Sequence, residues 1–272
     1  ALHLEEHVFP ALEAEIASAS ETPDDVSAVV RSEYGMQALF GPSILKVPYG
    51  EGFGHLPALR YGAYGYVNYL TAYAVYPEVM ERDFALQGEL AERRNRAGAR
   101  AIVEGGLPKV VRLDHDMADS SGTLVDVRTL DELWFPHFAR AIRPYLDAGI
   151  RLLWHCDGNL MEMVPRLIEA GIGGFQGFQY EDGMDYEKIA RLKTRDGDDL
   201  LIVAGVSVTR TLPFGTPADV RRELDWLVRH GPRTGLFLGA SSSIAPGVPW
   251  ENLQALVDGL RHYRDRGREG AP

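Results

Sequence analysis

The sequence has almost no cysteine and no long apolar run. A disulfide within the chain is excluded because Cys156 is its single cysteine, and this usage is typical of a reducing compartment, so we expect a cytoplasmic protein. No signal peptide is recognisable, and no stretch reaches the roughly 18 consecutive apolar residues that a membrane helix needs. We therefore expect no membrane partner.

Positive charge is in deficit, with 28 Lys and Arg residues against 39 Asp and Glu residues and a net charge of -11. This balance makes nucleic acid a poor partner. Internal repeats, low-complexity tracts and interdomain linkers are also missing, so we expect one domain over residues 1–272. Its first residues look helical without a start signal, which predicts that sequence upstream is missing.

Strand and helix patterns alternate along most of the chain. Such alternation predicts an α/β fold with a parallel sheet. The expected strands lie at 43–47, 110–113, 150–154, 173–179, 200–206 and 235–240. The length suits one α/β barrel, which takes about 250 residues.

Several helices have recognisable signals. Residues 1–40 read as amphipathic helix interrupted near 21–24, and further helices are expected at 78–95, 184–193 and 250–266. A capping box at Thr129–Glu132 predicts one helix start, and Thr216 before Pro217 predicts another. Residues 48–76 are rich in glycine and tyrosine, which favours a lid that either packs over the fold or forms a wall for a flat ligand.

Polar residues follow three of the expected strands. The run 150–154 is followed by His155 and Asp157, set before the helical pattern that opens at Leu160. Residues two apart on a strand share a face, so these two side chains should point together and Cys156 away from them. By the same rule, we expect further side chains beside His155 and Asp157 at the carboxyl ends of the strands: Asp114, Asp116, Gln179, Glu181 and Ser242.

Each of these residues also has a structural interpretation. Asp often caps turns, Asp157-Gly158 is a turn signature, and a lone histidine such as His155 is commonly structural. Recurrence at three strand ends favours chemistry instead. Carboxylates gathered at the ends of neighbouring strands repel one another unless a metal, a cationic or N–H-rich ligand, or protonation reduces their charge repulsion. Such carboxylates suit acid–base catalysis.

Five segments in order resemble the uroporphyrinogen decarboxylase superfamily. They are Leu113–Ala118, Trp154–Asn159, Leu167–Gly171, Thr211–Pro217 and Ile244–Asn252. The resemblance covers roughly residues 104–263 and implies a single TIM (β/α)8 barrel beneath the N-terminal helical and tyrosine-rich lid. It also implies one of two activities: decarboxylation of a porphyrinogen, or methyl transfer between a small substrate, a corrinoid or corrinoid protein, and a thiol.

Departures from the family pattern separate these activities. The arginine-rich segment by which the decarboxylase binds its tetrapyrrole is missing. Zinc-dependent members carry His-x-Cys and a later cysteine, whereas Asp157 and Ser242 stand at or near those positions here. Since zinc favours thiolate and imidazole ligands, the resemblance is closer to the branch with Asp in place of Cys, for which methyl transfer involving a corrinoid is implied.

We therefore expect a methyltransferase, with a porphyrinogen-type decarboxylase and a non-catalytic ligand-binding barrel as alternatives. The expected catalytic residues are Asp116, His155, Asp157 and Glu181, and the expected substrate contacts are Asp114, Asn159, Gln179, Tyr180 and Ser242. A divalent metal, if bound, is expected on His155, Asp157 and Glu181. The sequence does not indicate the methyl donor, the methyl acceptor or the oligomeric state.

Overall fold

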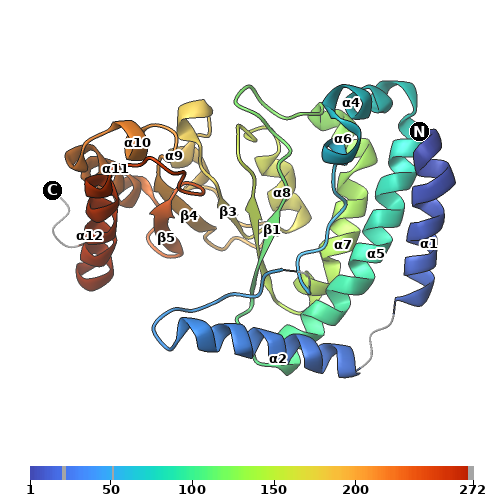
Figure 1. Ribbon diagram of the computed structural model, residues 1–272, viewed down its shortest axis with the longest axis horizontal. Coiled ribbons are helices and arrows are strands. Elements are labelled where there is room, and N and C mark those ends of the chain that lie inside the picture. Colours follow the sequence, from blue (N-terminus) through green and yellow to red (C-terminus); the bar gives the residue numbers. More distant parts are fainter. Residues whose placement is uncertain (20–22, 51, 269–272) are drawn as a thin grey trace. The chain divides into compact units, whose positions relative to one another are not determined.

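The computed structural model describes residues 1–19, 23–50 and 52–268, and they form two compact units (Figure 1). The first unit comprises Ala1–His115 and Leu124–Leu153, and the second comprises Asp116–Thr123 and Trp154–Pro272. Among the described residues, no helix combines the length and apolar character needed to cross a membrane.

The first unit is built around one long helix, α5 (Pro77–Glu104). The other helical segments of this unit are η1 (Leu4–Val8), α1 (Phe9–Ser18), α2 (Pro23–Phe40), α3 (Tyr61–Tyr64), α4 (Tyr66–Val75), α6 (Val127–Leu133) and α7 (Phe135–Asp147). Helices α1, α2 and α7 all pack on α5, and Figure 1 shows α1, α5 and α7 running alongside one another. The core here includes Phe84 and Ile102 of α5 with Phe138 and Ile142 of α7. The interruption expected near 21–24 falls partly outside the described residues.

Two expectations in this unit are wrong. Residues 43–47 form no strand. The capping box expected at Thr129 does not start a helix, because α6 already begins at Val127, where the Asp126 side chain accepts a hydrogen bond from the Arg128 amide. The earlier acidic residue therefore takes the N-cap role.

The sheet contains five strands in the order β1-β2-β3-β4-β5. They are β1 (Val110–Asp114), β2 (Arg151–His155), β3 (Gly174–Gln176), β4 (Leu201–Val206) and β5 (Leu236–Ala240). Strands β3 and β4 pair in parallel with Gly174 opposite Leu201, and β4 and β5 pair in parallel with Ile202 opposite Leu236. The expected α/β fold with a parallel sheet is confirmed. Eight strands were expected and the described residues form five, so closure into a barrel stays a prediction.

The second unit places helices after its strands. They are α8 (Val164–Ala170), η2 (Tyr180–Asp182), α9 (Tyr186–Ile189), α10 (Thr211–Phe214), α11 (Pro217–His230) and α12 (Trp250–Arg266). Thr216 caps α11 as expected, since its hydroxyl accepts from the Asp219 amide and the Asp219 carboxylate accepts from the Thr216 amide. Val220 and Leu224 of α11 pack with Val206 of β4 and Leu256 of α12. This packing fixes the carboxyl end of β4 against α11.

Candidate functional site

Three of the expected catalytic side chains lie together in the second unit. His155 ends β2 and is 8% exposed, and its Nε2 lies 3.9 Å from Asp157 Oδ1. A ring nitrogen of His155 and a carboxylate oxygen of Asp116 lie within 4.8 Å of each other. The Asp116 Oδ1 also accepts a hydrogen bond of 2.9 Å from the Asp157 amide. An imidazole between two carboxylates can hold a proton and pass it to a bound molecule.

Asp157 is bonded through only one of its two carboxylate oxygens. Its Oδ2 accepts from the Ser242 hydroxyl at 3.2 Å, which joins the loops that follow β2 and β5. Its Oδ1 is buried and accepts no hydrogen bond from the described residues. The free oxygen is the one that lies nearer to His155, so it is the atom available to a proton or a ligand.

Glu181 lies in η2 and is bonded in the same one-sided way. Its Oε1 accepts from the Thr209 hydroxyl at 2.6 Å and from the Ser207 hydroxyl, while Oε2 is buried without a partner among the described residues. The guanidinium of Arg210 donates to the Glu181 carbonyl at 3.3 Å. Hydroxyl donors therefore orient this carboxylate and leave its second oxygen open.

The loops that carry these residues are tied to one another. Gln179 Oε1 accepts from the Gly158 amide at 2.6 Å, and Asn159 Oδ1 accepts from the Met161 amide at 3.2 Å. Gly177 adopts φ +89°, and a Cβ there would lie 2.8 Å from the Cys156 carbonyl and 3.1 Å from His155 Nδ1. In the described structure Gln179 and Asn159, both expected to contact substrate, contact the protein's own loops.

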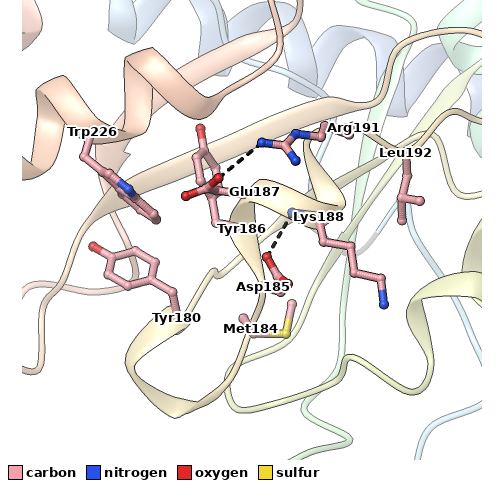
Figure 2. Close-up of a pocket in the computed structure, with 9 residues that line it drawn as sticks. All are labelled: Tyr180, Met184, Asp185, Tyr186, Glu187, Lys188, Arg191, Leu192 and Trp226. Atoms are coloured by element: carbon pink, nitrogen blue, oxygen red, sulfur yellow. Dashed lines mark hydrogen bonds and ion pairs between the residues drawn. The ribbon is translucent and has the colours of Figure 1, made fainter.

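Tyr180 contacts a different set of residues from its neighbour Glu181. Its ring meets Trp226 of α11 edge-on, with ring centroids 5.1 Å apart. Figure 2 shows the two rings on one side of a pocket of about 700 Å³ that is also lined by Glu187, Lys188 and Arg191. Tyr180 and Glu181 both lie in the 3₁₀ helix η2, beyond the end of β3, so the alternation of side chains along a strand does not apply to them.

Asp114 belongs to the first unit and is engaged there. It pairs with Arg112 at 2.6 Å and accepts from the Tyr49 hydroxyl at 3.2 Å. His115, the next residue, accepts from the Leu59 amide at 2.7 Å and stacks on Tyr61. Within this unit Asp114 thus has a cation and a hydroxyl as partners.

The residues present do not fit a thiolate-rich zinc site. Cys156 is buried, its sulfur accepts from the Met117 amide at 3.3 Å, and its thiol donates to the Asp157 carbonyl at 3.0 Å. Burial raises the pKa of this thiol to about 12, so it stays protonated at neutral pH. Among the described residues, His155, Asp157 and Glu181 are not found as one close cluster, and a metal ion on these three residues stays a prediction.

Four residues of this site were not found by sequence reasoning. Ser207, Thr209 and Arg210 follow β4 and contact Glu181, and Glu223 of α11 accepts a 2.7 Å hydrogen bond from the Ser207 amide. A usable signal was present for three of them, since they come directly after the strand that ends at Val206. The rule that polar residues after a parallel strand gather at one edge applied to this strand too.

Comparison with known proteins gives one assignment. No curated protein matches the chain. The family model described as uroporphyrinogen decarboxylase matches residues 101–263, which is more than half of the chain and contains β1 to β5. The chain belongs to the uroporphyrinogen decarboxylase family.

Proposed function

We propose that this protein is a methyltransferase of the family, which transfers a methyl group between a small substrate and a corrinoid, or between a corrinoid and a thiol. The observation that carries the proposal is the His155 and Asp157 pair, held at 3.9 Å beside Asp116, with Asp157 Oδ1 open. Methyl transfer to a thiol releases the thiol proton, and transfer from a methylated oxygen or nitrogen requires a proton on the departing atom. A histidine oriented by carboxylates can serve either need.

Each residue has a distinct part in this scheme. His155 accepts or donates the proton, and the Asp157 carboxylate stabilises the charged imidazole. Ser242 and Asp116 keep Asp157 in place, through its Oδ2 and its amide respectively. Glu181 contacts the substrate through Oε2. No step requires a metal ion in this scheme, and a corrinoid enters as a substrate or as the cargo of a partner protein.

The charge of the site argues against the decarboxylase alternative. A porphyrinogen carries several carboxylates, which guanidinium and ammonium groups bind best. The carboxylates assigned to this site are instead Asp116, Asp157 and Glu181, and the Arg210 guanidinium donates to the Glu181 carbonyl. This composition favours a neutral or cationic small substrate. We also propose that the sheet closes into a barrel, supported by the sequential strand order and the family assignment.

One experiment separates the two activities. The protein is incubated with methylcobalamin and dithiothreitol, and loss of the methyl–cobalt absorbance is followed; a parallel reaction contains uroporphyrinogen, whose products are separated by carboxylate number. We expect methylcobalamin to be consumed and uroporphyrinogen to remain. Decarboxylated porphyrinogens without methylcobalamin loss would replace the proposal with the alternative, and turnover of neither would favour the non-catalytic barrel.

A further inference from the structure

Ser207 stands between two carboxylates that belong to different elements. It follows β4 and is 2% exposed. Its amide donates to Glu223 Oε1 of α11 at 2.7 Å, and its hydroxyl donates to Glu181 Oε1 of η2. The backbone donor and the side-chain donor of one residue thus link an outer helix to a carboxylate of the proposed site.

We propose that Glu223 is a positioning residue for Glu181 and acts on it through Ser207. The inference rests on the proposed function to the extent that Glu181 is taken as a site residue. While Glu223 is ionised, its hydrogen bond with the Ser207 amide is charge-assisted and holds the start of the loop after β4. Ser207 Oγ is then held against Glu181 Oε1, which leaves Oε2 directed to the substrate.

The hydroxyl groups of Ser207 and Thr209 both bond to Glu181, but only one of these two residues also contacts Glu223. Thr209 donates to the same oxygen at 2.6 Å and its hydroxyl lies 3.2 Å from Ser207 Oγ. Thr209 is exposed and makes no bond to Glu223, whereas Ser207 is buried and does. Loss of the Glu223 charge should therefore reach Glu181 through Ser207 and leave the Thr209 bond in place.

The protonation state of Glu223 changes near neutral pH. Burial raises its pKa to about 7, and the Ser207 amide opposes that rise. The charged groups linked to this bond are Glu181, through Ser207, and Arg210, whose amide donates to Ser207 Oγ at 3.1 Å. Helix α10 carries no titratable side chain, and between α12 and α11 the Tyr263 hydroxyl donates to Asp225. Glu181 should thus respond to a proton that binds on the outer helix.

The test is nuclear magnetic resonance of the full chain with uniform ¹⁵N labelling and ¹³C-labelled glutamate, titrated between about pH 5 and pH 9. We expect the Ser207 amide and the Glu181 carboxyl carbon to shift together with a midpoint near pH 7. Glu223→Gln should abolish both shifts. Ser207→Ala should keep the amide shift at position 207 and abolish the Glu181 shift, and Ser207→Cys, which nearly preserves volume, serves if the alanine variant does not fold.

Two outcomes would overturn the inference. One is a Ser207 amide that does not titrate in the native chain. The other is a Glu181 shift near pH 7 that persists in both Glu223→Gln and the Ser207 variant. Thr209→Val is the matched control and should leave the common midpoint unchanged. Because no substrate is present, a failure of methyl transfer would leave these outcomes unaffected, and the two proposals can fail separately.

Discussion

Two carboxylates, one in each unit, are bonded in opposite ways. Asp83 in α5 is fully buried, and Arg60 donates to both of its oxygens while Gln87 donates to Oδ2 at 2.9 Å. Asp157 in the second unit has one oxygen on Ser242 and the other without a donor among the described residues. A carboxylate whose two oxygens both accept hydrogen bonds can stabilise the fold. A carboxylate with one oxygen that accepts none is available to a ligand or a proton.

The largest expected effect is on the stability of the fold, when the fully hydrogen-bonded carboxylate of Asp83 is removed. Asp83→Ala leaves the guanidinium of Arg60, which is 25% exposed, without its partner. Removing one member of such a pair costs about 3–5 kcal/mol, and urea unfolding measures it. Glu13→Ala, which breaks the exposed pair of Glu13 and Arg82, should cost less than about 1 kcal/mol. Equal losses in the two variants would mean that the buried pair has no special structural part.

The next effect tests how closely the loop at Gly177 packs against the site around His155. Gly177→Ala places a methyl group at φ +89°, 2.8 Å from the Cys156 carbonyl and close to the His155 ring. Backbone strain and crowding together should cost about 2 kcal/mol or more in a denaturant titration. Gly197→Ala is the matched control, since Gly197 has φ +90° and open space around it, and it should cost about 1 kcal/mol. A Gly177 variant as stable as the Gly197 variant would show that this loop is not close-packed.

A smaller effect concerns the pH dependence of stability at Glu223. The folded protein binds this proton more tightly than the unfolded chain does, because burial raises the pKa of Glu223 to about 7. The stabilisation that proton binding by Glu223 gives the folded state is therefore complete below the pKa of Glu223 in the unfolded chain. It is lost as the pH rises through 7. Glu223→Gln should gain thermal stability relative to the native chain as the pH is raised through this range. The exposed Glu251→Gln variant should show no such trend, and a constant offset for Glu223→Gln at all pH values would contradict the shift.

The sequence predicted the helices and strands of the second unit better than the hydrogen bonds between its distant residues. Residue parity separated His155 and Asp157 from Cys156, and the limits of α12 agree with the expected 250–266. Helical and strand periodicities are properties of neighbouring residues, so they can be read along the chain. Asp126 displaced the expected cap at Thr129 because two nearby residues could each start a helix.

The bonds of the site join residues far apart in the chain, and local patterns do not determine them. Ser242 meets Asp157 across 85 positions, and Ser207 meets Glu181 across 26. Glu223 gave no sequence signal, since it is one charged residue among several on an amphipathic helix. Its importance is evident only when the end of β4 is placed against α11.

The most direct test of the account is methyl transfer by the Asp157→Asn variant. Asparagine preserves the shape of the side chain and can still accept from Ser242, but it removes the charge beside His155. With methylcobalamin as substrate, we expect the rate to fall by a factor of about 10² or more, the usual contribution of acid–base catalysis, while urea unfolding stays near that of the native chain. An unchanged rate would contradict the assignment of Asp157 and His155 as the proton-handling pair.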